Sequence, residues 1–190
     1  MAYDVDRTPQ EIDLPLDRCC SGGGKRWHWS ATFAYPEDEL PGPHVQNWIS
    51  RQDQSALAQM ASKLPKHISE RKDRYRVWVM PLPLTIAPSL TWRAVGDPVA
   101  VSELLQAVVA IGKKRASGHG LVLEWEITPE PEADPWEFSH LHPDGSLGRT
   151  APAECLRGRS EIPHGGHGHI GLRPPYMHPL RRFPVTLPAR

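Results

Sequence analysis

The sequence predicts an α+β protein with a ferredoxin-like (RRM-like, βαββαβ) core over residues 25–128. Two segments carry apolar residues at helical spacing, and four segments show the alternation or aromatic and β-branched content typical of strands. Their order is strand, helix, strand, strand, helix, strand, which is the split βαβ arrangement. Residues 1–24 and 129–190 then become an N-terminal and a C-terminal extension.

Four segments of the sequence predict the first four elements of this core. Residues 26–35, "RWHWSATFAY", alternate and are aromatic enough to form a strand. Residues 51–64 have helical spacing, which Pro65 ends. Residues 74–84 and 89–95 are predicted as the second and third strands. The apolar positions of the predicted helix are Ala56, Leu57, Met60, Ala61 and Leu64.

The clearest element is a helix that begins after Asp97. The Asp97 side chain is suited to cap the helix, with Pro98 at its first position, and Gly112 is a plausible C-terminal stop. Residues 121–127, "LVLEWEI", follow as a strand with Leu121, Leu123, Trp125 and Ile127 on one face. The helix carries a stripe expected to be buried, made of Val101, Leu104, Leu105, Val108 and Val109.

Charge is balanced overall but segregated along the chain. The 190 residues contain 22 Lys and Arg against 22 Asp and Glu. Residues 63–76 and 157–190 are rich in cations, whereas residues 124–137 hold acids and no base. This pattern predicts a basic face that could bind a polyanion, although faces that are merely solvated would have the same pattern.

Cysteine and proline usage bear on the compartment and on the C-terminal region. Cys19, Cys20 and Cys155 are an odd number and no apolar signal segment opens the chain, so we expect a reduced, cytoplasmic protein. No apolar run reaches the roughly 18 residues of a membrane span, so we expect no membrane association. Proline is frequent in the last third, and we expect much of that region to have irregular backbone.

The segment "IGKKRASGHG", residues 111–120, is the main candidate binding loop. A Walker-type phosphate loop follows a strand and opens a helix, whereas this loop follows a predicted helix and precedes a strand. An anion would therefore be held by the loop's cations and by N–H groups that its glycines leave accessible. Two readings stay open, a loop that binds a polynucleotide backbone and a helix end with solvated cations.

The region around this loop resembles a known family. A helix, then "IGKKRASGHG", then a strand is similar to the C-terminal glycine-rich loop of the RAMP superfamily of CRISPR ribonucleoproteins. Residues 92–127 as a whole are most similar to the crRNA 5′-handle-binding subunits of type IV effector complexes. Residues 171–179, "GLRPPYMHP", resemble the arginine, proline and aromatic tail of that family.

The resemblance implies a non-catalytic RNA-binding subunit that serves antiviral defence. It would cap the 5′ handle of crRNA, contact the backbone subunit of the effector filament and a large subunit, and meet target DNA only indirectly, with no cofactor. Two departures are notable, because residues 1–24 lack the expected strand and helix, and His119 stands where an aromatic residue is common. The loop residues that would hold phosphates and a splayed base are Gly112, Lys113, Lys114, Arg115, Gly118, His119 and Gly120.

Further RNA contacts are expected where cations and aromatic residues alternate. "KRWHW", residues 25–29, has this character, although alternation would equally bury Trp27 and Trp29 in the core. The cations near residue 74 lead into a strand and could follow phosphates, or form a solvated basic loop. These additional candidates are Lys25, Arg26, Trp27, His28, Arg71, Arg74, Trp92, Arg93, Arg173, Tyr176 and His178.

Two functions of other classes remain as alternatives. A metal-independent RAMP endoribonuclease that processes repeat RNA would use His28, His119 or Tyr176 as acid and base, with Lys113 or Lys114 stabilising the transition state. A zinc-dependent scaffold would draw on "HGGHGH", residues 164–169, and the cysteines. Adjacent cysteines lack the usual C-x₂-C spacing and a His-Gly run lacks rigidity, so we expect a flexible loop there and no metal.

Overall fold

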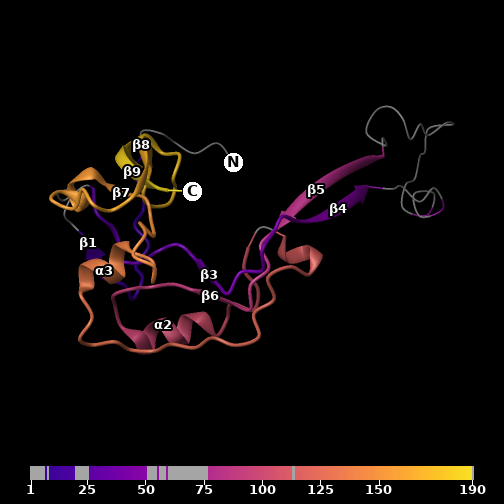
Figure 1. Ribbon diagram of the computed structural model, residues 1–190, viewed down its shortest axis with the longest axis horizontal. Helices are drawn as coiled ribbons and strands as arrows, with labels where there is room; N and C mark the ends of the chain where they lie inside the picture. Colours follow the sequence, from indigo (N-terminus) through magenta and orange to yellow (C-terminus); the bar gives the residue numbers. More distant parts are fainter. Residues whose placement is uncertain are drawn as a thin grey trace. The chain divides into compact units, whose positions relative to one another are not determined.

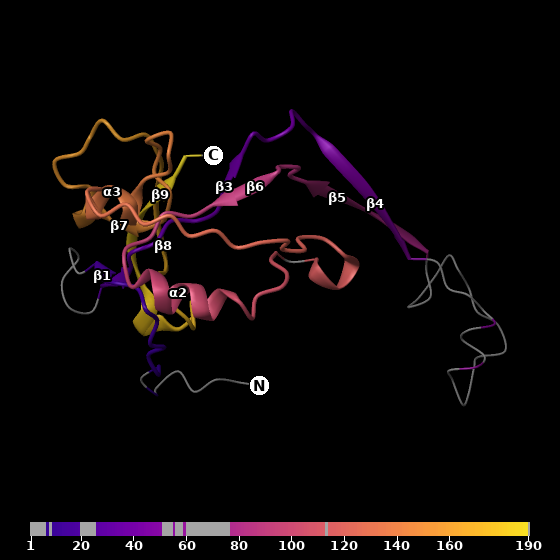
Figure 2. The same cartoon turned by 90° about the horizontal axis from the view of Figure 1, so that it is seen from below.

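The protein is a mixed α/β structure with few helices and several small antiparallel sheets (Figures 1 and 2). The computed structural model describes residues 7, 9–19, 26–50, 55, 59, 77–112 and 114–189. Two compact units are present, one made of residues 1–35 with 91–190 and the other of residues 36–90. The mixed α/β class is confirmed, while the ferredoxin-like order stays a prediction.

The C-terminal region of the first unit contains a three-stranded antiparallel sheet. Its strands are β7 (Ala151–Pro152), β8 (His164–Gly171) and β9 (Arg182–Pro188), in the order β7-β9-β8. Much of the backbone in the last third is irregular, as predicted, but this sheet interrupts it. The flexible loop predicted at residues 164–169 was wrong, because these residues belong to β8. Glycine makes β8 possible, because a Cβ at Gly165 would lie 2.3 Å from the Pro188 carbonyl oxygen.

Three shorter elements belong to the same unit as this sheet. Strand β1 (Arg18–Cys19) pairs antiparallel with β2 (His28–Trp29). Helix α3 (Pro135–His140) begins at Asp134, whose carboxylate accepts a hydrogen bond from the Trp136 amide at 2.8 Å. A 3₁₀ turn, η3 (Ala153–Leu156), follows β7. Figures 1 and 2 both show β1 and α3 close to the sheet.

The core of the described residues lies in this unit and not in the predicted segment 25–128 alone. Arg149 is buried beside it, where desolvation lowers its pKa to about 10. Its guanidinium remains satisfied because Nη1 donates to the carbonyls of Trp29 and Ala31, the latter at 2.7 Å. The buried apolar residues are Trp27, Leu147, Ala151, Cys155, Ile162, Leu172 and Val185.

Helix α2 (Pro98–Leu105) confirms the predicted cap but not the predicted stripe. The Asp97 carboxylate accepts hydrogen bonds from the amides of Val99 at 2.9 Å and Ala100 at 3.2 Å. The helix ends at Leu105, so Val108 and Val109 lie beyond it. None of its residues is buried. The cap depends on neighbouring residues alone, whereas burial of the stripe requires a partner surface.

The strand predicted at residues 121–127 is absent. Leu121 forms an isolated antiparallel bridge with Ala110, and the residues that follow have no strand partner among those described. Leu123 is 93 % exposed, so the predicted apolar face is not buried as a unit. The Trp125 indole instead donates to the Val108 carbonyl at 3.0 Å.

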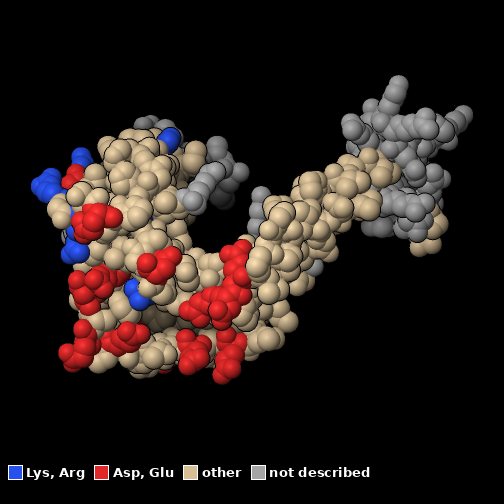
Figure 3. Space-filling model, viewed as in Figure 1, with Lys and Arg blue, Asp and Glu red and all other residues tan. Residues whose placement is uncertain are grey.

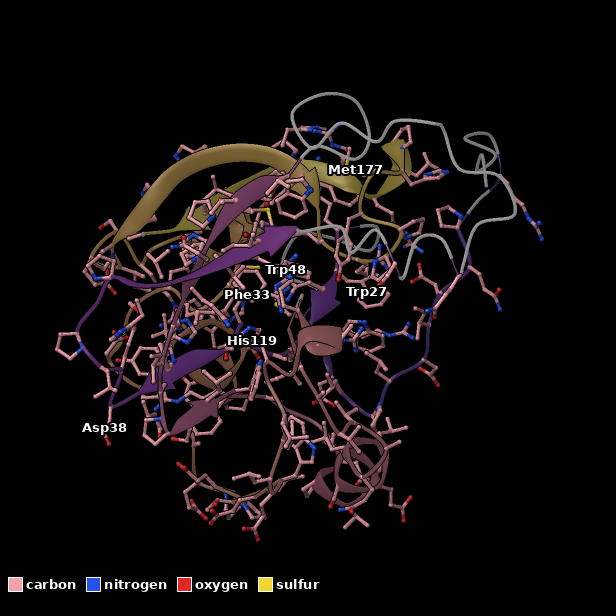
Figure 4. The ribbon with its side chains drawn as sticks, turned by 90° about the vertical axis from the view of Figure 1, so that its right-hand side faces the viewer. Trp27, Phe33, Asp38, Trp48, His119 and Met177 are labelled. Carbon is pink, nitrogen blue, oxygen red and sulfur yellow. The ribbon has the colours of Figure 1, made fainter. Side chains whose placement is uncertain are left out.

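The second unit contains an antiparallel ribbon formed by β4 (His44–Ser50) and β5 (Trp78–Leu84). Strand β5 lies within the predicted strand 74–84. Apolar side chains are exposed on both strands, including Trp48, which Figure 4 labels. The helix predicted at residues 51–64 lies outside the described residues except Ser55 and Gln59, which are helical.

Two very short strands complete the fold. Strand β3 (Tyr35–Glu37) pairs with β6 (Ser89–Thr91). The strands predicted over residues 26–35 and 89–95 are confirmed only in pieces, namely β2, the first residue of β3, and β6. Between these pieces lie isolated bridges such as Ala31 with Ala94. None of the described helices is long and apolar enough to cross a membrane.

Candidate nucleic-acid interface and a buried cysteine–histidine cluster

The glycine loop at residues 111–120 is a closed turn held by its two ends. The Ile111 amide donates to the Gly120 carbonyl at 2.8 Å, and the Val122 amide donates to the Val109 carbonyl at 3.0 Å. Gly120 has φ +70°, and a Cβ there would lie 2.1 Å from the Ile111 carbonyl oxygen. Only glycine allows the two ends of the loop to approach this closely.

Within the loop a 3₁₀ turn, η2 (Arg115–Ser117), ends at Gly118 in the left-handed conformation. Gly118 has φ +83° and open space where a Cβ would point, so its role is conformational and not one of close packing. Arg115 is exposed, and Lys114 and His119 are partly exposed. Figure 4 labels His119, and Lys113 lies outside the described residues.

The negative C-terminal end of helix α2 does not stabilise the cations of the loop. Because α2 ends at Leu105 with Gln106 as its C-cap, Gly112 is not the helix stop that the sequence predicted. The cations of the loop are therefore separated from the negative helix end, whose effect falls off within the last turn. The charge at a helix C-terminus therefore does not account for the Lys and Arg residues of the loop.

The aromatic and basic segment 25–29 is mostly internal. Trp27 is buried and its ring meets that of Trp29 edge to face, with centroids 4.9 Å apart. His28 has 0 % exposure. Arg26 is exposed and pairs with Glu154 at 2.8 Å, while Lys25 lies outside the described residues. The alternative of a buried Trp27 is confirmed, but burial does not alternate, because His28 is buried and Trp29 is only partly buried. Neither Trp27 nor His28 therefore has a surface for RNA.

Arg173 is also internal, which differs from its predicted contact with RNA. Its guanidinium lies 3.7 Å from the centroid of the Trp27 ring and pairs with Glu11 at 3.0 Å. Arg181 pairs with the same carboxylate. Desolvation, with the charge of Arg181, lowers the pKa of Arg173. Burial acts to raise the pKa of Glu11, but hydrogen bonds and charge from both arginines hold it below its usual range.

The other predicted tail residues divide into buried and exposed. His178 is 1 % exposed, and its Nδ1 accepts from the Leu180 amide at 3.2 Å. Tyr176 and Met177 are exposed, and Figure 4 labels Met177. Of the predicted tail contacts, only Tyr176 presents a side chain to a ligand.

Trp92 and Arg93 lie next to each other with different environments. Trp92 is exposed and its ring lies 5.9 Å from that of Trp125. Arg93 is half-buried, lies over the Phe138 ring at 4.8 Å and donates to the His142 carbonyl at 3.2 Å. Trp92 is thus the residue of the pair that can stack with a base. The predicted contacts Arg71 and Arg74 lie outside the described residues.

The acidic side chains of residues 124–137 are exposed. Figure 3 shows Asp and Glu side chains gathered over the lower part of the face in view, with few Lys or Arg among them. An RNA contact on this side is electrostatically disfavoured. The cation-rich residues 63–76 lie outside the described residues.

A cluster of Cys19, His28, His140 and Cys155 lies in the core, and sequence reasoning missed it. The ligand-type atoms of the four side chains all lie within 4.8 Å of one another. Cys19 Sγ lies 3.8 Å from both His140 Nε2 and Cys155 Sγ, and Cys155 Sγ lies 3.6 Å from His28 Nε2. Cys19 is partly exposed and the other three are buried.

The four residues of this cysteine–histidine cluster come from β1, β2, α3 and η3. These four residues have no short C-x₂-C or H-x₃-H spacing that would predict a metal site. From the sequence, the histidines of residues 164–169 were considered instead. Those histidines lie on β8, where His164, His167 and His169 are exposed. Burial of His28 at the cluster also removes it from the candidates for an RNA-cleaving acid or base.

The chain matches no protein-family model and no curated protein sequence.

Proposed function

We propose that this chain is the crRNA-binding subunit of a type IV CRISPR ribonucleoprotein, related to the RAMP superfamily and to its ferredoxin-like fold. In this role it caps the 5′ handle of crRNA and contacts the backbone subunit and a large subunit of the effector. The proposal is supported by the resemblance of residues 92–127 and by the exposed glycine loop within them. No described feature of the loop requires it for packing of the core.

The glycine loop carries the proposal because it combines charge with access. Arg115 is exposed at its tip, Lys114 and His119 are partly exposed beside it, and Gly118 leaves open space. A phosphate can approach the backbone closely at a glycine, since no Cβ stands in the way. A guanidinium nearby can form two hydrogen bonds to the same phosphate.

Aromatic side chains suited to unpaired bases are exposed in the same unit. Trp92 opens the segment that resembles the family, and Tyr176 lies in the tail that resembles it. Stacking of a base on an aromatic ring is worth about 1–3 kcal/mol and tolerates any sequence. The proposed interface therefore consists of the loop cations with Trp92 and Tyr176, without the buried Trp27, His28, Arg173 and His178.

The test compares two exposed arginines. Arg115→Ala removes a loop cation, and Arg157→Ala removes an exposed arginine outside the loop at the same cost in charge. We expect Arg115→Ala to weaken binding of repeat-derived RNA several-fold and Arg157→Ala to leave it near the wild-type value. Equal affinities for wild type and both variants would overturn the proposal.

The same RNA, recovered after incubation, tests the rival activity. The proposed role leaves the RNA intact, since capping requires no bond to break. A discrete cut within the repeat that Arg157→Ala retains and His119→Ala loses would replace the proposal with the endoribonuclease.

A further inference from the structure

We propose that Cys19, His28, His140 and Cys155 bind a single Zn²⁺ ion as a closed, structural Cys₂His₂ centre. The inference is independent of the proposed RNA-binding function, because it rests on a different set of residues and its test contains no RNA. It also differs from the sequence-based expectation, which weighed zinc only at residues 164–169 with the cysteines.

Three distances within the cysteine–histidine cluster match the edges of a zinc tetrahedron. Bond lengths of about 2.3 Å to sulfur and 2.0–2.1 Å to nitrogen place two sulfurs ~3.8 Å apart and a sulfur and a nitrogen ~3.6 Å apart. The two Sγ atoms are 3.8 Å apart, and the two sulfur–nitrogen pairs are separated by 3.8 and 3.6 Å. The remaining pairs of ligand-type atoms lie within 4.8 Å of each other, so small side-chain shifts would bring all four atoms within reach of one ion.

A disulfide and an iron–sulfur cluster both fit these four side chains less well than zinc does. A disulfide between Cys19 and Cys155 requires sulfurs about 2.0 Å apart, whereas their Sγ atoms are 3.8 Å apart. A two-iron cluster of the Rieske type would place the cysteines on one iron and the histidines on the other. Here each sulfur lies within 3.8 Å of a histidine nitrogen, which indicates one shared ion.

Both imidazoles are oriented for coordination through Nε2. His28 Nδ1 lies 2.9 Å from the carbonyl oxygen of Trp29, and His140 Nδ1 lies 2.8 Å from that of Trp136. A carbonyl can only accept, so each Nδ1 carries the proton and each Nε2 presents its lone pair to the cluster. This carbonyl contact behind the ligand is the arrangement found around metal-bound histidines.

The surroundings hold the cluster rigidly. The Trp136 ring stacks on His140, with centroids 4.6 Å apart and planes 15° apart, and its indole donates to the Cys155 carbonyl at 3.1 Å. The His28 and His140 rings meet edge to face at 5.1 Å. A ligand set of two sulfurs and two imidazoles in tetrahedral geometry favours zinc over calcium, magnesium or manganese, which prefer oxygen.

The role that follows is structural. All four coordination positions are supplied by the protein, so no position stays open for water or substrate as a catalytic zinc site requires. The ion would join β1 and β2, near the N-terminus, to α3 and η3 more than a hundred residues later. Two thiolates and one Zn²⁺ are neutral together, which permits burial of the charged groups.

The experiment uses the full chain, purified without a histidine tag. We expect elemental analysis to find one zinc per chain. Replacement by Co²⁺ should give the intense visible bands of a tetrahedral site with a thiolate-to-cobalt charge-transfer band. Wild-type protein without stoichiometric zinc, and with only the weak spectrum of octahedral Co²⁺, would overturn the proposal, and this measurement needs no variant to fold.

Two variants locate the ion. Cys155→Ser should lose the zinc and the charge-transfer band. The matched control replaces His164, His167 and His169 together by Ser, and it should retain one zinc per chain because these residues lie exposed on β8. Loss of zinc in the control with retention in Cys155→Ser would assign the metal to β8 and refute the cluster.

Discussion

The cysteine–histidine cluster and the glycine loop belong to the same unit but are built in opposite ways. The cluster is buried and joins four segments between Cys19 and Cys155. The loop is exposed and closes on itself through hydrogen bonds between residues 109–111 and 120–122. A site of the first kind determines whether the unit folds, whereas a site of the second kind can change without loss of the fold.

The arginines of this unit differ in the same way, since some are buried and one lies exposed in the loop. In the unit that contains the cluster, Arg149, Arg173 and Arg181 are buried and bind backbone carbonyls or Glu11. In the loop, Arg115 is exposed and available to a partner. The arginines of this chain are therefore not equivalent, and substitution of a buried one tests folding and not RNA binding.

The largest loss of stability is expected from His140→Ala, because the proposed zinc centre would be needed for the unit to fold. Removal of one ligand disrupts a zinc site whose binding free energy is of the order of 10 kcal/mol, comparable with the whole stability of a domain. We expect loss of the cooperative thermal transition and rapid digestion by chymotrypsin. His169→Ala is the matched control, since His169 lies exposed on β8 and outside the cluster. A cooperative melt at the wild-type temperature in His140→Ala would contradict this role.

A smaller effect is expected from the two loop glycines, and it should differ between them. Gly120→Ala places a Cβ against the Ile111 carbonyl at φ +70°, which we expect to cost about 2–3 kcal/mol. Gly118→Ala meets open space at φ +83° and should cost about 1 kcal/mol from backbone strain alone. Urea denaturation measures both, and hydrogen exchange at the Ile111 amide reports opening of the loop. Equal costs would show that the close approach at Gly120 is not important.

The smallest expected effect is a change in the pH dependence of Tm when Glu11 is replaced by Gln. The pKa of Glu11 is lowered on folding, so its contribution is present above its ordinary value of 4.5 and is lost as pH falls through the lowered value. The carboxylate is partly exposed, so solvent screening limits the effect to about 3 °C in Tm. Between about pH 6 and pH 3, wild type should lose more Tm than Glu11→Gln. Asp13→Asn, at an exposed ion pair with Arg18, should lose as much as wild type.

What the sequence could predict follows the same division between local and distant contacts. The Asp97 cap and the glycine turn were predicted because each depends on residues within a few positions of one another. The strand at residues 121–127 was predicted from an alternation that is present, but a strand also needs a partner, and Leu121 alone is bridged.

The errors at the C-terminus have a related cause. The glycines of residues 164–171 indicated flexibility, yet Gly165 and Gly171 each sit where a Cβ would collide with a carbonyl oxygen, at 2.3 and 2.2 Å. They permit close packing of β8, and recognising this requires knowledge of the neighbouring segments. The cysteine–histidine cluster could not be predicted for the same reason. Its four residues have no short sequence spacing and come together only in the fold.

The most direct test of RNA binding by the glycine loop is the salt dependence of affinity for repeat-derived RNA. Wild-type affinity should fall steeply between about 50 and 200 mM salt, because phosphate contacts release counterions. Replacing Lys113, Lys114 and Arg115 by Ala should reduce the slope of log affinity against log salt by up to about 2, at roughly 0.7 per lost contact with single-stranded RNA. The zinc content and melting temperature should stay at their wild-type values. A triple variant that remains folded and keeps the wild-type affinity and slope would contradict the assignment of RNA binding to this loop.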